Sequence, residues 1–183
     1  MLNIQMLEDK PSAVIKVFGV GGCGCNAVAY MIKQGIRYQI EFIAANTDLQ
    51  TLNLNPAPVL LQLGKTLTKG LGAGCQPEKG KQAAQESREQ IKEALQGADL
   101  VFITAGMGGG TGTGGAPIVA EVAKEMNILT VGVVTRPCKV DGKRIAGLAE
   151  DGITALSAVV DSLMVLPNDK MLEELGGDVD LEE

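Results

Sequence analysis

The chain has 183 residues, of which 45% are hydrophobic and only 3% aromatic, with a formal net charge of −6 and no histidine. This length suits one domain, the acidic balance and scarce aromatic rings argue against a nucleic-acid surface, and the lack of histidine excludes Ser-His-Asp hydrolysis. No apolar run reaches the about 18 residues of a membrane span and residues 1–10 lack secretory-signal character, so we expect a cytoplasmic protein without direct membrane insertion.

Short apolar runs alternate with amphipathic stretches along the chain. In chain order, the pattern predicts strands at 13–20, 40–45, 58–63, 100–105, 128–135 and 162–166, and helices at 26–34, 48–54, 77–95, 117–126 and 147–159. The strand segments are nearly continuously apolar, which is typical of parallel strands buried on both faces. The predicted fold class is therefore α/β, with a doubly wound, mostly parallel, Rossmann-like sheet that binds its ligand at the carboxyl ends of the strands.

Glycine is concentrated in three clusters beside these elements. The clusters lie at 19–24, 70–74 and 106–115 and hold four, three and seven of the 24 glycines. Glycine between a strand and a helix lets backbone N–H groups approach a ligand closely, and a helix N-terminus adds partial positive charge. A flexible turn would explain one such cluster, whereas three at the ligand edge indicate a phosphate-binding site.

The clusters differ in the nucleotide that they suit. The segment GVGGCG at 19–24 fits the G-x-G-x-x-G dinucleotide pattern, and Asp48 lies near the end of the second strand, which supports an NAD-binding oxidoreductase domain as an alternative. No Walker-type P-loop occurs. The third cluster, GMGGGTGTGG at 106–115, offers more amides and hydroxyls than a dinucleotide needs and suits a triphosphate.

The segment GGGTGTG at 108–114 resembles the signature motif of the tubulin/FtsZ family. NTD at 46–48, TKGLGAG at 68–74 and PNDK at 167–170 are similar to further family segments in order and spacing. The resemblance extends over about 13–175, which we expect to be the GTP-binding domain, with an N-terminal extension at 1–12 and an acidic tail at 176–183. It implies binding of GTP or GDP with Mg²⁺, and a bacterial cell-division GTPase that self-associates into filaments at the septum and hydrolyses GTP between subunits. Other division proteins are further partners that the resemblance implies.

The resemblance also implies a role for each loop. The first loop would contact the diphosphate, the third the β- and γ-phosphates, the second would sense the γ-phosphate, and later segments would hold the ribose and base. The implied nucleotide-binding residues are Gly21, Gly22, Cys23, Gly24, Cys25, Asn26, Ala73, Gly74, Gly108, Gly109, Gly110, Thr111, Gly112, Thr113, Thr135, Pro137, Asp141, Arg144 and Asn168. Asn46 and Asp48 would lie near the terminal phosphate. Asp48 is the candidate Mg²⁺ ligand, or alternatively a helix N-cap.

The sequence departs from the family pattern at several of these positions. Cys23 and Cys25 interrupt the glycines of the first loop, and Asp141 stands where the family has Glu. The family's arginine position is Ile145, with Arg144 one residue earlier, and one residue rotates a helical side chain by about 100°. The four cysteines lack the C-x₂-C spacing of a metal site, and we interpret them as small residues in place of Gly or Ala.

The family's catalytic synergy loop and second domain have no counterpart within residues 1–183. We therefore expect nucleotide binding without appreciable turnover by this chain alone. A third interpretation is a non-catalytic interaction fragment, whose exposed apolar surface would bind a second copy or an intact homologue.

Overall fold

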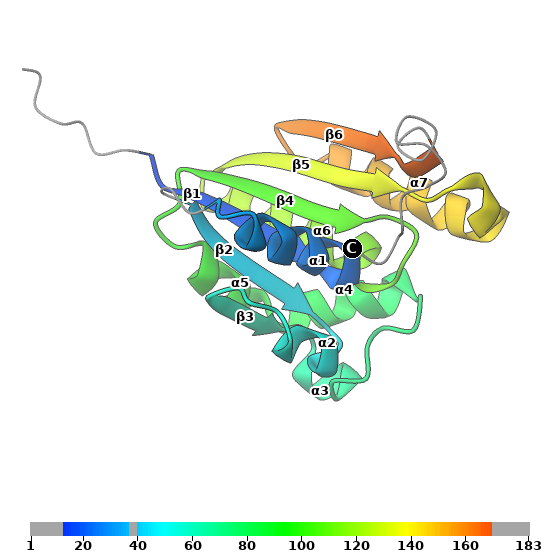
Figure 1. The fold of residues 1–183 in the computed structure, drawn as a ribbon, viewed down its shortest axis with the longest axis horizontal. Helices are drawn as coiled ribbons and strands as arrows, with labels where there is room; N and C mark the ends of the chain where they lie inside the picture. Colours follow the sequence, from blue (N-terminus) through cyan, green and yellow to red (C-terminus); the bar gives the residue numbers. More distant parts are fainter. Residues whose placement is uncertain (1–12, 37–39, 170–183) are drawn as a thin grey trace, which may run out of the picture.

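A sheet of six parallel strands lies at the centre of the molecule (Figure 1), whose structure, a computed structural model, describes residues 13–36 and 40–169. The strands are β1 (Ile15–Val20), β2 (Ile40–Asn46), β3 (Val59–Gln62), β4 (Leu100–Gly106), β5 (Leu129–Arg136) and β6 (Ser162–Pro167). Their order is β3-β2-β1-β4-β5-β6, and every pairing is parallel. This arrangement confirms the predicted doubly wound α/β class. The predicted extension at 1–12 and tail at 176–183 lie outside the described residues.

Helices cover both faces of the sheet. They are α1 (Gly21–Lys33), α2 (Leu49–Asn53), α3 (Lys65–Thr68), α4 (Pro77–Glu86), α5 (Arg88–Leu95), α6 (Thr111–Glu125) and α7 (Lys143–Ser157), and a 3₁₀ turn, η1 (Lys139–Asp141), precedes α7. In Figure 1, α1 lies in front of the sheet, whereas α5, α6 and α7 lie behind it. The chain order reverses between β1 and β4, which is the switch point where open α/β sheets bind ligands.

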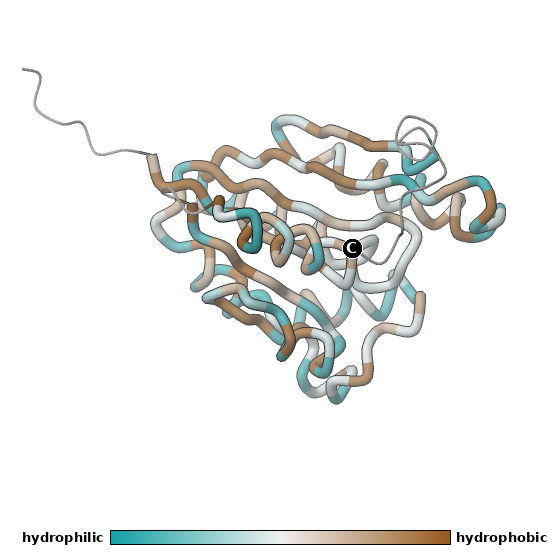
Figure 2. The backbone as a smooth tube through the Cα atoms, in the orientation of Figure 1, coloured by the Kyte–Doolittle hydropathy of each residue, from teal (hydrophilic) through white to brown (hydrophobic). Residues whose placement is uncertain are grey.

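Alternate residues of β1 divide the interior into two cores. Phe18 and Val20 are fully buried in the larger core beneath α4 to α7, whereas Val17 packs with Cys25 and Val28 of α1 in the smaller core. Figure 2 shows the hydrophobic colour concentrated along the central strands. Burial of the strands on both faces accounts for their continuous apolar runs.

The predicted helix 147–159 begins at Lys143, and two glycine-rich helices also begin earlier than their periodicity predicts. The predicted helix 26–34 begins at Gly21, and the predicted helix 117–126 begins at Thr111. A Cβ on Gly24 would lie 2.2 Å from the carbonyl oxygen of Thr104, and one on Gly114 would lie 1.9 Å from that of Pro77. Close packing therefore requires glycine inside these first turns, and tertiary contacts override its low helix propensity.

The predicted helix 77–95 is divided into α4 and α5 at Ser87. Ser87 is 4% exposed, and its hydroxyl accepts a hydrogen bond from the N–H of Gly64 at 2.9 Å. The side chain thus secures the connection between β3 and α3 at the point where the helix breaks. The short helix α3 itself gives no periodic signal in the sequence.

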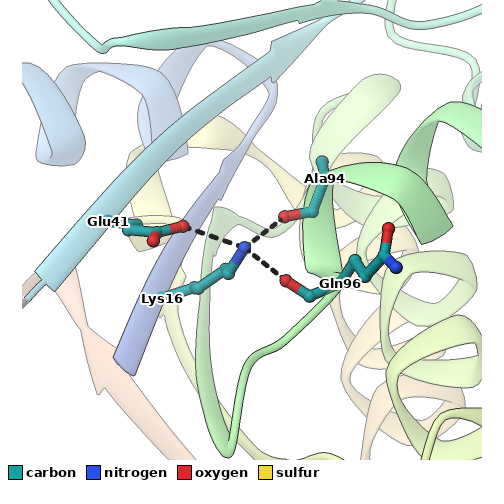
Figure 3. Close-up of polar contacts among 4 residues, drawn as sticks. All are labelled: Lys16, Glu41, Ala94 and Gln96. Atoms are coloured by element: carbon teal, nitrogen blue, oxygen red, sulfur yellow. Dashed lines mark hydrogen bonds and ion pairs between the residues drawn. The ribbon is translucent and has the colours of Figure 1, made fainter. Parts of the chain in front are cut away.

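A buried lysine closes the amino end of the sheet. Lys16 of β1 is 6% exposed, and its ammonium donates to the carbonyl oxygens of Ala94 and Gln96 at 3.0 and 2.9 Å (Figure 3). It also pairs with Glu41 of β2 at 2.9 Å. The two carbonyls belong to the last turn and C-cap of α5, where cations are favoured because helix carbonyls lack partners.

Candidate functional site

A cleft of about 340 Å³ opens at the carboxyl ends of the central strands. The predicted site residues that line it are Gly21, Gly22, Cys23, Gly109, Gly110, Thr111, Gly112, Thr135, Pro137, Asp141 and Asn168. Three further lining residues, Val20, Gly106 and Met107, were not predicted. Val20 and Gly106 end β1 and β4. Val20 lay within the predicted strand 13–20, whereas Gly106 belongs to the third glycine cluster but was not among the implied ligands.

Two helix N-termini meet in this cleft. Helix α1 begins at Gly21 and α6 at Thr111, and both residues line the cleft. First-turn N–H groups lack intrahelical partners, and each helix dipole places partial positive charge at its N-terminus. Among the described residues that line the cleft, Asp141 has the only formally charged side chain. Attraction for an anion therefore comes from the backbone, which is the geometry of a phosphate cradle.

Glycine backbones bring the first and third loops into contact. Gly21 has φ +72°, and a Cβ there would lie 2.8 Å from the amide nitrogen of Gly112. Gly108 has φ +104°, and its N–H donates to the hydroxyl of Thr113 at 2.9 Å. Thr113, a predicted phosphate ligand, is 4% exposed and does not line the cleft. Its hydroxyl instead holds the turn at Gly108.

The two cysteines of the first loop have different environments. Cys23 is exposed in the cleft, with its Sγ 3.7 Å from the hydroxyl oxygen of Thr135. Cys25 is fully buried, and its thiol points to the carbonyl oxygen of Ala45 at 3.5 Å. Burial raises the pKa of the Cys25 thiol to about 12. Of these two side chains, only that of Cys23 lines the cleft.

Of the two residues Asp141 and Arg144, only Asp141 lines the cleft. The Asp141 carboxylate accepts a hydrogen bond from the N–H of Cys138 at 2.8 Å and so caps η1. Arg144 is exposed and does not line the cleft, whereas Ile145 lies against the backbone of Gly108. Desolvation, followed by the charges of nearby carboxylates, raises the pKa of the Cys138 thiol.

The remaining predicted residues lie around the cleft rather than in it. Gly24, Cys25, Asn26, Ala73, Gly74, Gly108, Thr113 and Arg144 are absent from its lining, as is Asp48. Asp48 serves as the N-cap of α2, where its carboxylate accepts from the N–H of Thr51 at 3.1 Å. Ala73 is buried, and a Cβ placed on Gly110 would lie 2.8 Å from its methyl group. The second loop thus packs against the back of the third.

Thr47 is a site residue that sequence reasoning missed. It is fully buried, and its hydroxyl oxygen lies 2.6 Å from that of Thr111 in the cleft wall. It lies in the segment NTD that the resemblance includes, but its contact with Thr111 is visible only in the tertiary structure.

Residues 13–36 and 40–169 contain neither a clustered metal site nor a membrane-spanning helix. No group of three or more Cys, Asp or Glu side chains gathers there as a metal site. None of the helices in these ranges has the length and apolar character needed to cross a bilayer.

Comparison with known proteins gives consistent matches over nearly the whole chain. The profile of the Tubulin/FtsZ family, GTPase domain, matches residues 14–176. The chain is 59% identical over 170 residues to the cell division protein FtsZ of Pseudomonas aeruginosa, with 93% of this chain and 43% of that protein covered. It is 57% identical over 178 residues to FtsZ of Pseudomonas putida, with 97% of this chain and 44% of that protein covered. The chain therefore spans less than half the length of these relatives.

Solved structures agree with the sequence matches. An empty FtsZ dimer from M. jannaschii superposes with a TM-score of 0.90 at 44% identity, covering 95% of this chain and 50% of that chain. CetZ1 from Haloferax volcanii shares the fold, with a TM-score of 0.82 at 24% identity and coverage of 92% of this chain and 54% of that chain. Profile, sequence and structure together show that the chain belongs to the tubulin/FtsZ family and spans its GTPase domain.

Proposed function

We propose that the chain is the GTP- and GDP-binding domain of a cytoskeletal GTPase of bacterial cell division. The observation that carries this proposal is the cleft in which the glycine-rich N-termini of α1 and α6 meet. The relatives at 59% and 57% identity are cell division proteins. The alternative of an NAD-binding domain explains only the first glycine loop.

Different residues of the cleft bind different parts of the nucleotide. The backbone amides of Gly21 to Cys23 and of Gly109 to Gly112 hold the phosphates, and the Thr111 hydroxyl adds a side-chain donor. Asp141 and Asn168 line the same cleft and are assigned to the ribose and base. Phosphoryl transfer depends mostly on positioning and charge neutralisation, and this backbone cradle supplies both.

Mg²⁺ would be held largely by the ligand. One carboxylate oxygen of Asp48 is already engaged with the N–H of Thr51, so the side chain has its second oxygen to offer. Mg²⁺ usually retains several waters and combines one or two carboxylates with substrate phosphates, so Asp48, which lies outside the lining of the cleft, would contribute at most one carboxylate oxygen. When bound, the ion would neutralise charge on the phosphate oxygens.

The chain alone is proposed to bind GTP without appreciable hydrolysis. Orienting an attacking water requires an acid or polar group aimed at it, and the Asp141 carboxylate in the cleft is engaged with the N–H of Cys138. We assign the missing group to a second subunit, in keeping with self-association into filaments. A solved relative at 44% identity is a dimer. Cytoplasmic location at the division septum is part of the same proposal.

Calorimetric titration with GDP, GTP, ATP and NAD in the presence of Mg²⁺ tests the nucleotide assignment. We expect the guanine nucleotides to bind and ATP and NAD not to bind. Binding of NAD without GDP would replace the proposal by its alternative. Phosphate release from GTP should stay at background in the same preparation, and rapid release without an added subunit would contradict the second-subunit assignment.

A matched pair of glycine variants locates the binding. An added Cβ meets no atom within 4 Å at either Gly109 in the cleft or Gly147 in α7. Gly109→Ala should weaken GDP binding because its methyl group enters the ligand space, whereas Gly147→Ala should leave the Kd unchanged. Equal Kd values for the two variants would place the nucleotide elsewhere.

A further inference from the structure

Thr47 connects the wall of the cleft to the loop at 70–74. Its side chain is fully buried at the end of β2, and its hydroxyl oxygen lies 2.6 Å from that of Thr111, the first residue of α6. Its backbone carbonyl accepts from the N–H of Gly72 at 3.2 Å. One residue thus contacts both the third glycine loop and the second.

The hydroxyl pair can adopt two hydrogen-bond directions. Each threonine hydroxyl has one hydrogen to donate and lone pairs to accept with. If Thr111 donates to Thr47, the lone pairs of Thr111 face the cleft and repel an anionic oxygen. If Thr47 donates to Thr111, the hydrogen of Thr111 is free to point into the cleft.

An anionic ligand selects between these directions. A hydrogen bond to a charged oxygen is about twice as strong as one between neutral groups, so a phosphate oxygen in the cleft favours the arrangement in which Thr111 donates to it. The buried hydroxyl of Thr47 then donates to Thr111 and keeps its partner. Both hydroxyls remain satisfied, which makes Thr47 the fixed end of a short donor chain.

We propose that Thr47 is a positioning residue that donates to the Thr111 hydroxyl and thereby turns the Thr111 hydrogen toward a phosphate oxygen of the nucleotide. The inference rests on the proposed nucleotide function and adds a residue that does not line the cleft. The Thr47 carbonyl separately accepts from the N–H of Gly72, so the same residue is also held against the second glycine loop.

A double-mutant cycle with calorimetry on the full chain tests the donor chain, with GTP and inorganic triphosphate as probes. Thr47→Val keeps the side-chain shape and removes the hydroxyl, and we expect it to weaken GTP binding about five- to tenfold. Thr47→Ser keeps the hydroxyl and should bind within about twofold of wild type. In a Thr111→Val background, Thr47→Val should cause no further loss, because the chain is already broken.

Thr130→Val is a matched control. Thr130 is 1% exposed, and its hydroxyl donates to the carbonyl oxygen of Ile128 at 2.9 Å at the start of β5, away from the cleft. Its substitution should leave the Kd for GTP unchanged even where it lowers the Tm. If Thr47→Val does not fold, Thr47→Ala replaces it in the cycle with the same expected coupling.

The outcomes separate this inference from the function on which it rests. Three results would each overturn the positioning role. The first is that Thr47→Val lowers the affinity for GTP equally in both Thr111 backgrounds. The others are that Thr47→Val binds GTP with wild-type affinity, or that Thr47→Ser binds as weakly as Thr47→Val. If the wild-type chain binds inorganic triphosphate but does not bind GTP, the nucleotide assignment is rejected. The inference then stands when the double-mutant cycle measured with triphosphate shows coupling between Thr47 and Thr111. If wild type binds neither probe, both proposals are wrong.

Discussion

The two ends of the parallel sheet differ in how the unpaired backbone groups of their helix termini are satisfied. At the amino end, the free carbonyls that end α5 are satisfied internally by the buried ammonium of Lys16 (Figure 3). At the carboxyl end, two helices present their N-termini to an open cleft whose described lining holds no basic side chain. A closed end satisfied by a protein charge stabilises the fold, whereas an open end that offers backbone donors suits an exchangeable anionic ligand.

The close helix packing behind the carboxyl end is the feature whose loss should have the largest effect. In Gly114→Ala, the new Cβ would lie 1.9 Å from the carbonyl oxygen of Pro77, and α6 cannot move away from α4 without distorting the cleft. We expect a loss of about 3 kcal/mol or more in the free energy of unfolding, measured by urea denaturation. Gly147 is an exposed residue in the middle of α7. Gly147→Ala should instead raise the free energy of unfolding by up to about 1 kcal/mol. Similar midpoints for the two variants would contradict the packing argument.

Removing the charge at the amino end should have the next largest effect. Lys16→Met leaves the carbonyls of Ala94 and Gln96 without their buried donor, and we expect a loss of roughly 2 kcal/mol in the free energy of unfolding. The Kd for GDP should not change, since the cleft lies at the opposite end of the sheet. Lys124→Met, at an exposed position, serves as the control and should stay within about 0.5 kcal/mol of wild type. A changed Kd in Lys16→Met would show that the two ends are not independent.

Cysteine labelling measures ligand occupancy at the carboxyl end. Cys23 lines the cleft, so GDP at about ten times its Kd should slow Cys23 alkylation about tenfold. Cys75 is exposed outside the cleft lining and provides an internal control that should react equally with and without GDP. Cys25 should resist labelling throughout, because burial raises the pKa of its thiol to about 12. Mass spectrometry follows each site, and a Cys23 rate that ignores GDP would remove Cys23 from the nucleotide site.

The smallest effect is expected from an exposed carboxylate that caps α3. Glu86 accepts hydrogen bonds from the N–H groups of Thr66 and Leu67 at 2.7 and 3.1 Å, which lower the pKa of its carboxyl group. A lowered folded-state pKa gives stability that is present above the unfolded pKa and is lost as the pH falls through the folded value. Glu86→Gln should therefore lower the Tm slightly at pH 7 and leave it equal to that of wild type in strong acid. Glu93→Gln is the control, and a Tm difference for Glu86→Gln that persisted in acid would exclude the charge as its cause.

The sequence predicted the sheet well and the helix boundaries less well. Buried parallel strands are continuously apolar, so all six strands were predicted to within a few residues, including β6 (Ser162–Pro167). The starts of α1 and α6 were missed because glycine has low helix propensity, and its need for space is visible only when Thr104 or Pro77 is in place. The break at Ser87 was missed because it depends on a tertiary contact: its partner Gly64 lies 23 residues away.

The candidate site shows the same division. The first and third glycine clusters predicted a site at the carboxyl ends of the strands, and most of their predicted residues line the cleft there, whereas Ala73 and Gly74 of the second cluster do not. Periodicity could not place individual side chains, so Thr113 lies beneath the turn, Cys25 lies in the core and Arg144 lies outside the cleft. Thr47 was missed because its partner Thr111 is 64 residues away in the chain.

By itself, the sequence determined the α/β class and the resemblance to a family, and it predicted the edge of the sheet where the cleft opens, because apolar runs and glycine spacing are local properties. The tertiary structure decided which glycines line the cleft and which make room for a neighbouring helix. It also decided that Lys16 is satisfied within the protein and that Thr47 meets Thr111. These are contacts between residues far apart in the chain, and their energies depend on distances that only the folded backbone sets.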